Sequence, residues 1–336
     1  MVTLKPLEQL VDGAATRDIP RERLADRYRA VMLGVAAGNA LGLALEGMSH
    51  SAIRRHHPDG VDTVPAAERD RPWDDDLAQT AVLAEVLLRT QELNPDLLAQ
   101  ELVRWSKENG RGIGGLTRDV IGELERGTPA RRAARVVWER TGWSNAGNGA
   151  VMRCAPVALR YRKSGAALIR SARASAVVTH FDARCEWSTA IVCVALARAL
   201  ADEPTTMQEL AAAVDALSEQ DVDPAAKDQL AEAIRHADRA DLARLALDDA
   251  MDMGYTLKAM QVVLWCVQQR GDFRSLVSRI VEGGGDTDTN GALAGAAVAA
   301  SGSAADIPPE WLEHISRTEE LTVLAYRLLD AAEGSA

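Results

Sequence analysis

Apolar positions recur every three or four residues over long stretches of the chain, which is the spacing of helices with one buried face. This pattern predicts helices over residues 21–46, 74–88, 171–201 and 256–270. No segment alternates apolar and polar residues between turn signals, so a sheet is not expected. The pattern therefore predicts an all-α protein.

Helix starts give the same result. A polar residue followed by proline is typical of the first turn of a helix, where the missing N–H of proline costs nothing. Thr206 and Glu209 have the spacing of a capping box and predict the start of a further helix. The proline-marked helices are expected to run from Asn94 to Gly110, from Thr128 to Gly142 and from Asp223 to about Leu247.

The N-terminal segment is more polar than the rest of the chain. Residues 1–21 are polar and lack a basic segment followed by an apolar one, so we expect a loose leader and no signal peptide. No linker or low-complexity segment divides residues 22–330, which predicts a single domain. No uncharged apolar stretch reaches the ~18 residues that a membrane helix needs.

Composition narrows the class of protein. Hydrophobic residues make up 47% of the 336 residues but aromatic residues only 4%, so the core must be built from Ala, Leu and Val. The net charge of -11 argues against strong nucleic-acid binding, which needs an excess of Lys and Arg. Four cysteines without a CxxC pair are typical of buried thiols in a reducing compartment, so a cytoplasmic protein is expected.

The segment Gly283–Gly291 carries the densest chemistry. Three glycines precede Asp286, Asp288 and Thr289, and a small, apolar helix follows from Ala292. Carboxylates packed against a buried helix repel one another and lose solvation, so a cation should neutralise them. Oxygen ligands of this kind suit Mg²⁺, Mn²⁺ or Ca²⁺. A simple helix cap needs fewer carboxylates, which makes a metal site the better interpretation.

A calcium loop of the EF-hand type is the alternative for this segment. Asp286, Asp288, Asn290 and Gly291 match the beginning of such a loop. Its twelfth position should be a bidentate Glu, and here it is Ala297. The EF-hand interpretation therefore fails.

A second acidic segment, Asp74–Asp76, lies at the start of a predicted helix. Three adjacent carboxylates suit the helix dipole and could equally direct side chains to a metal. The aspartate-rich helix of an all-α terpenoid synthase is a rival interpretation. Gln79 at the second Asp position of that motif, and the lack of a later Asn/Ser/Glu motif, weaken it.

Between the acidic segments lies a glycine-containing stretch, Asn145–Pro156. Its glycines would expose backbone N–H groups suited to phosphate oxygens, and Arg153 could add positive charge, although an ordinary loop fits the same pattern. His180, beside Phe181, and Glu46, at a predicted helix end, indicate little individually.

Taken in order, these segments resemble the ADP-ribosylglycohydrolase family, which includes the dinitrogen reductase-activating glycohydrolase. The resemblance implies a single compact orthogonal helical bundle whose central cleft binds two Mg²⁺ or Mn²⁺ ions and hydrolyses glycosidic bonds to ADP-ribose. The matching segments are Gly38–Gly42 with Glu46, Trp73–Asp76, Gly147–Arg153 with Ala155 and Pro156, Thr179 with His180, Gly254–Leu257 and Gly283–Thr289.

The resemblance also assigns roles by position. It implies metal ligation by Asp74, Asp75, Asp76, Asp286, Asp288 and Thr289. It implies catalysis by Glu46, Asp75 and Asp288, with water activated at the metal pair. The implied substrate-binding residues are Gly112, Gly114, Gly147, Asn148, Gly149, Met152, Arg153 and His180.

Three positions depart from the family pattern. Asp74 replaces the usual Thr, and Asn39 replaces a frequent Asp. Gly112 stands where arginine-specific relatives carry an Asp before Ile-Gly, which argues against ADP-ribosyl-arginine as the substrate. The expected partner is ADP-ribose or an ADP-ribosylated substrate of unspecified linkage, with no membrane and a monomer as the simplest state. A non-catalytic ADP-ribose-binding protein on the same fold is the remaining alternative.

Overall fold

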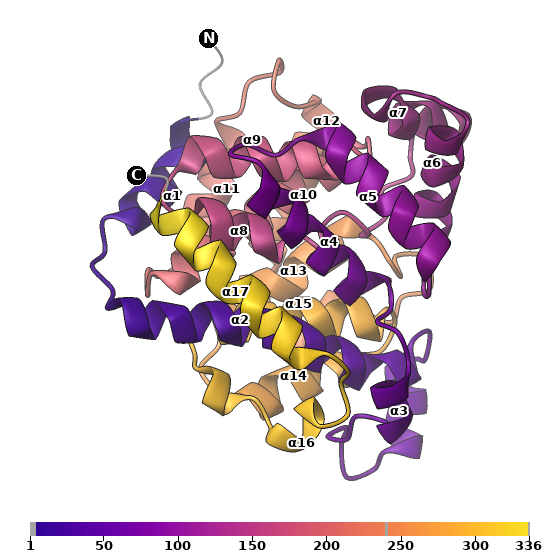
Figure 1. Cartoon of the computed structure of the whole chain (residues 1–336), viewed down its shortest axis with the longest axis vertical. Coiled ribbons are helices and arrows are strands. Elements are labelled where there is room, and N and C mark those ends of the chain that lie inside the picture. Colours follow the sequence, from indigo (N-terminus) through magenta and orange to yellow (C-terminus); the bar gives the residue numbers. More distant parts are fainter. Residues whose placement is uncertain (1–4, 239–240, 335–336) are drawn as a thin grey trace.

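The computed structural model describes residues 5–238 and 241–334, and Figure 1 shows helices joined by loops throughout. Seventeen α-helices and four short 3-10 helices are present in these ranges. The described residues contain no strand, and only two isolated β-bridges join Ser49 to Gly284 and Gly147 to Tyr255. The predicted all-α fold is confirmed.

The helices follow one another with short connections. The first seven are α1 (Lys5–Ala15), α2 (Arg21–Gly42), α3 (His50–His56), α4 (Asp75–Arg89), α5 (Pro95–Glu108), α6 (Gly115–Glu125) and α7 (Ala130–Arg140). The next five are α8 (Ala155–Tyr161), α9 (Gly165–Ala176), α10 (Ala183–Leu200), α11 (Met207–Asp215) and α12 (Pro224–His236). The last five are α13 (Thr256–Cys266), α14 (Phe273–Glu282), α15 (Thr287–Ala299), α16 (Pro309–Leu312) and α17 (Thr318–Glu333). The 3-10 helices are η1 (Leu43–Leu45), η2 (Ala66–Asp70), η3 (Leu242–Leu245) and η4 (Ala304–Asp306).

Side-chain caps fix several predicted helix starts. The Asn94 side chain accepts hydrogen bonds from the backbone of Asp96 and Leu97 at 3.0 and 3.1 Å, and α5 begins there. The Thr206 hydroxyl accepts from the Glu209 backbone at 3.1 Å to begin α11. Each of these bonds satisfies a backbone N–H that has no partner within its helix.

Two predicted helices are too long. The run 171–201 is broken between α9 and α10, because Asp182 accepts a hydrogen bond from the Arg184 backbone and caps a new helix. His180 lies in that break. The helix expected over 223–247 ends at His236, and the short η3 follows.

The expectation of a loose leader is wrong for residues 5–15. They form α1, in which Leu7, Val11 and Ala14 are almost fully buried. Their spacing of four and three residues places them on one helix face, which packs against α9 and α10. A hydrogen bond of 2.7 Å from the Gly165 backbone to Asp12 adds a polar contact.

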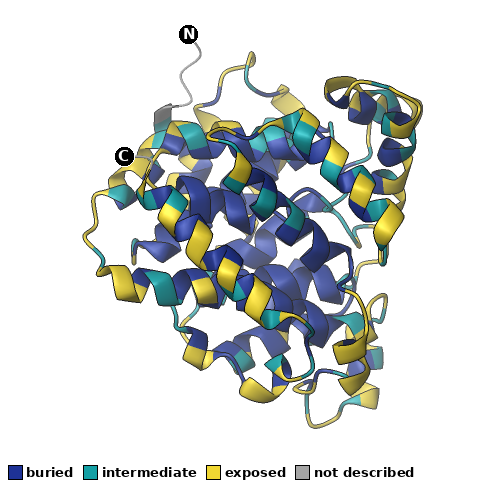
Figure 2. Ribbon diagram, viewed as in Figure 1, coloured by how far each residue is buried: buried dark blue, intermediate teal, exposed yellow. Residues whose placement is uncertain are grey.

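Helices α2 and α15 pack together at the centre of the molecule, where the dark blue residues of Figure 2 concentrate. Glycines face backbone across this contact. A Cβ added to Gly38 would lie 1.9 Å from the carbonyl oxygen of Gly291, and one added to Gly34 would lie 2.5 Å from that of Gly295. The close approach brings the end of α2 beside the start of α15, so that Gly42 accepts a hydrogen bond from the Thr287 hydroxyl at 2.8 Å.

The apolar character of α2 follows from this central place. Arg21–Leu45 is long and apolar enough to cross a membrane by length and composition, but 83% of its apolar window is buried inside the protein. Most of this helix is therefore covered by neighbouring helices, as expected of a core helix.

Helices α6 and α7 stand at the edge of the molecule (Figure 1). They share a small apolar cluster of their own, formed by Val120, Ala133, Ala134 and Val137. The loop that leads into α6 passes the aspartates at the start of α4. In this loop, Gly112 lies directly against Asp75.

Candidate active site

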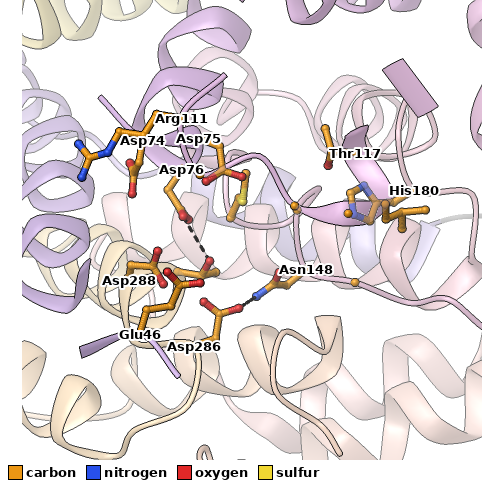
Figure 3. A pocket seen from close by; sticks show the side chains of 18 of the residues that line it. Glu46, Asp74, Asp75, Asp76, Arg111, Thr117, Asn148, His180, Asp286 and Asp288 are labelled. Atoms are coloured by element: carbon orange, nitrogen blue, oxygen red, sulfur yellow. Dashed lines mark hydrogen bonds between the residues drawn. The ribbon is translucent and has the colours of Figure 1, made fainter. Parts of the chain in front are cut away.

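The two aspartate segments meet at one place in the fold. Asp74–Asp76 forms the first turn of α4, and Asp286–Thr289 forms the first turn of α15. The Thr289 hydroxyl donates a hydrogen bond of 3.3 Å to Asp76 Oδ2, although the two residues are 213 positions apart. Figure 3 shows Asp74, Asp75 and Asp76 on one side of a cavity and Asp286, Asp288 and Glu46 on the other.

Asp74, Asp75 and Asp76 each offer a carboxylate oxygen within 4.8 Å of the others, and all three are buried. Asp76 Oδ1 and, across the cavity, Asp288 Oδ1 are buried without a hydrogen-bond partner among the described residues. Such atoms are costly unless a further partner satisfies them. The donor set is all oxygen, which is the set that Mg²⁺ and Mn²⁺ prefer. The buried triad could therefore hold a metal ion.

Burial and mutual repulsion shift the carboxylates of this site. Burial, followed by the charge of Asp74, raises the pKa of Asp75 to about 7. Burial and then Asp288 raise the pKa of Asp76 well above its usual range, and burial and then Asp286 do the same for Asp288. Loss of solvation and the nearby Asp286 also raise the pKa of Glu46, although this residue is solvent-exposed. The protein itself does not neutralise the cluster.

Arg111 is the only Lys or Arg among the described residues that line the cavity. Its charge favours the ionised form of Asp74. Its guanidinium is nevertheless held by an ion pair of 2.8 Å with Glu68 and a hydrogen bond of 2.8 Å to the Pro72 carbonyl. Six carboxylates line the cavity and its one arginine is already paired with Glu68, so the ionised carboxylates lack a balancing charge among the lining residues. A bound cation is the simplest way to balance this charge.

The cavity has a volume of about 440 Å³, enough for a nucleotide-sized ligand. All the predicted metal-ligating and catalytic residues line it, as do all the predicted substrate-binding residues except Arg153. Six other residues that line the cavity have no role predicted from the sequence. They are Leu43, Arg111, Gly115, Leu116, Thr117 and Asn145.

The glycine-containing loop forms a further wall of the cavity, beside Asp286. Asn148 donates from its side chain to Asp286 Oδ2 at 2.8 Å and from its backbone to the Gly254 carbonyl at 2.9 Å, which fixes the loop. No hydrogen bond within the described part of the chain uses the N–H groups of Gly147 and Gly149. These two groups are therefore available to oxygen atoms of a ligand.

The structure differs from the sequence analysis in its placement of Arg153. This side chain is fully buried beneath the loop and does not reach the cavity. It donates to Gln79 at 2.7 Å, to the Gly149 carbonyl at 2.9 Å and to the Thr179 hydroxyl at 2.6 Å. Arg153 therefore supports the loop, and its predicted contact with a phosphate is wrong.

His180 lines the cavity with the edge of its ring. A Cβ added to Gly149 would lie 2.8 Å from His180 Cε1 and 3.1 Å from Nε2, so the ring lies directly against the glycine loop. Burial, and then the charge of Arg153, lower the pKa of His180 to about 3. The ring is therefore neutral at pH 7.

The fold and the cavity define an all-α protein with a buried acidic site suited to divalent cations. The family model of the ADP-ribosylglycohydrolases matches residues 20–336. The chain belongs to the ADP-ribosylglycohydrolase family.

Individual relatives cover nearly the same extent. An uncharacterized protein of Archaeoglobus fulgidus is 32% identical over 91% of this chain and 97% of its own length. The ADP-ribosylarginine hydrolase Tri1 of Pseudomonas putida is 26% identical over 93% of this chain and 80% of its own. A solved structure described as an ADP-ribosylglycohydrolase-related protein complex matches with a TM-score of 0.70 at 25% identity, covering 93% of this chain and 99% of that chain.

Proposed function

We propose that this protein is a metal-dependent hydrolase that cleaves the glycosidic bond between ADP-ribose and an acceptor. The observation that carries the proposal is the hydrogen bond between Thr289 and Asp76, because it joins the two acidic segments in one cavity. Membership of the family supports the reaction class. Two Mg²⁺ or Mn²⁺ ions, held by Asp74, Asp75, Asp76, Asp286, Asp288 and Thr289, would supply positive charge that orients the ribose hydroxyls and activates water.

The carboxylates around the cavity have distinct roles in this proposal. Glu46 is the most open of them and carries a raised pKa, so it is suited to accept a proton from the attacking water. Asp75 and Asp288 stabilise the positive charge that develops at C1″ as the acceptor leaves. Asn148 keeps Asp286 in place through its 2.8 Å hydrogen bond.

The glycine loop binds the remainder of the substrate. The free N–H groups of Gly147 and Gly149 donate to oxygen atoms of the diphosphate and of the adjoining ribose. Met152 and His180 form the apolar and polar parts of the wall behind them. Gly112 and Gly114 leave room for the ligand on the side of α6.

The acceptor is proposed to be something other than arginine. Gly112 has a φ of +81°, and a Cβ added there would lie 2.5 Å from Asp75 Oδ1. No side chain at this position can therefore reach a guanidinium without moving Asp75. The name of the Pseudomonas putida relative includes arginine, so an arginine-linked substrate belongs in the test.

The test is release of ADP-ribose from arginine, serine, nucleic-acid-end and O-acetyl linkages, each with Mg²⁺, Mn²⁺ or EDTA. We expect metal-dependent release from at least one linkage, and a loss of more than about 100-fold in Asp288→Asn. Asp119→Asn, an exposed carboxylate of α6 outside the cavity, is the matched control. Binding of ADP-ribose without turnover of any linkage would favour a non-catalytic binding protein instead.

The cellular setting is proposed from the cysteines. All four are free and buried, and burial raises the pKa values of Cys185, Cys193 and Cys266. Thiols of this kind suit a reducing compartment, so we place the protein in the cytoplasm.

A further inference from the structure

A chain of three polar side chains runs from the protein interior to the cavity. Arg153 Nη2 donates to Thr179 Oγ1 at 2.6 Å, and Thr179 Oγ1 lies 2.8 Å from His180 Nδ1. All three residues are buried, with exposures of 0%, 0% and 2%. Only the last of them, His180, lines the cavity.

The directions of these hydrogen bonds follow from the chemistry of the groups. A guanidinium can only donate, so the Thr179 oxygen accepts from Arg153. The Thr179 hydroxyl can still donate its own hydrogen bond. Among the described residues, His180 Nδ1 is the only acceptor within reach of this hydroxyl. If Nδ1 carried the proton instead, the buried hydroxyl would keep an unused donor, which is unfavourable in the protein interior.

We infer that Arg153 and Thr179 fix His180 in the tautomer whose proton lies on Nε2, so that His180 donates a hydrogen bond to an oxygen atom of the bound ligand. Nε2 has no partner in the described part of the chain and lies against the Gly147–Gly149 loop. Arg153 and Thr179 are positioning residues in this arrangement. The low pKa of His180 agrees with a ring that carries a single proton.

The inference deepens the proposed function and rests on it for the identity of the ligand. Gly147 N–H, Gly149 N–H and His180 Nε2–H are donors gathered on one wall, so together they suit an oxygen-rich group. Diphosphate and ribose oxygens share this chemistry. Binding of ADP-ribose, AMP and ribose 5-phosphate distinguishes which of these oxygen atoms the wall recognises.

The first test is nitrogen NMR of the ligand-free protein at pH 7, with labelled histidine. The chain has 6 histidines, and His180→Gln identifies the signal by its loss. We expect a single neutral tautomer with its proton on Nε2. Thr179→Val should turn this signal into a mixture of tautomers, and Thr179→Ser should restore it. A wild-type proton on Nδ1 would overturn the relay even if Thr179→Val failed to fold.

The second test is calorimetric binding of the three probes. Thr179→Val should weaken ADP-ribose binding about fivefold, and Thr179→Ser should recover it. Ser175→Ala is the matched control, because it removes a neighbouring buried hydroxyl that donates to Ala172 and not to His180. Equal affinity in wild type and Thr179→Val would overturn the inference. A wild-type protein that binds none of the probes would overturn the ligand assignment and the proposed function together, whatever the tautomer.

Discussion

Asn39 Nδ2 lies 2.8 Å from Asp74 Oδ2, so two of the positions at which the sequence departs from its family pattern are in contact. Both residues are 2% exposed. The resemblance implies an Asp at position 39 and a Thr at position 74, and a Thr hydroxyl there could donate to the carboxylate of the Asp. In this protein the carboxylate belongs to Asp74, which caps the start of α4, and the donor is the Asn39 side chain on α2. Together the two departures therefore exchange the positions of the donor and the acceptor.

This exchange predicts coupled mutations. Asn39→Asp should destabilise the protein in EDTA by about 2–4 kcal/mol, because it replaces the donor by a second buried carboxylate. Adding Asp74→Thr to Asn39→Asp should recover most of the loss. Urea unfolding of both single variants and the double variant gives the coupling free energy. Strictly additive effects would show that the two positions are independent.

The raised pKa of Asp75 predicts that the stability of the folded protein decreases as pH rises. Its folded-state pKa is about 7 and its reference value is 3.8, so between these values the folded protein keeps a proton that the unfolded chain has lost. The free energy of unfolding in EDTA should therefore decrease as pH rises through this window, by roughly 4 kcal/mol. Asp75→Asn should flatten the slope. Identical slopes in wild type and variant, measured by urea unfolding, would refute the shift.

The glycine contact between α2 and α15 predicts a local steric effect. Gly38→Ala should cost about 3 kcal/mol or more, because its Cβ would overlap the Gly291 carbonyl and force the helices apart. Gly13→Ala is the matched control, since Gly13 lies in α1 with no atom within 4 Å of an added Cβ. There the change should be neutral or stabilising by up to about 1 kcal/mol. Thermal unfolding that shifts equally in both variants would contradict the packing argument.

Gly112 predicts that arginine specificity cannot be introduced by one substitution. Gly112→Asp should weaken Mn²⁺ binding at least about tenfold, because the new carboxylate would lie against Asp75 and strain a backbone with positive φ. Gly115→Asp adds the same charge to the cavity wall at a position with open space around it. Calorimetric titration with Mn²⁺ compares the two. Equal affinities, or new release of ADP-ribose from arginine in Gly112→Asp, would disprove this account.

The sequence predicts the helices and the acidic segments well because their signals are local. Asn94 before Pro95 identifies the start of α5, and the alternating Asp286 and Asp288 identify a cluster that needs a cation. The resemblance to a family supplied the pairing of the two segments. Periodicity alone cannot bring residues 213 positions apart into contact.

Other features depend on the three-dimensional packing. Leu7, Val11 and Ala14 have helical spacing, but the sequence around them is polar, so the pattern alone does not predict α1. Arg153 lies in the glycine loop as expected, but the direction of its side chain is set by Gln79 on α4 and by Thr179 in the break between α9 and α10. The charge of a loop residue does not indicate whether its side chain contacts a ligand in the cavity or other residues of the protein interior.

The central claim is that both aspartate segments hold divalent ions in one site. Crystals grown with Mn²⁺ test it through anomalous scattering, which locates the ions independently of activity. We predict Mn²⁺ in the cavity with oxygen ligands from both Asp74–Asp76 and Asp286–Thr289, and loss of that signal in Asp288→Asn. Mn²⁺ bound by one segment alone, or a cavity without Mn²⁺ in well-folded crystals, would contradict the account.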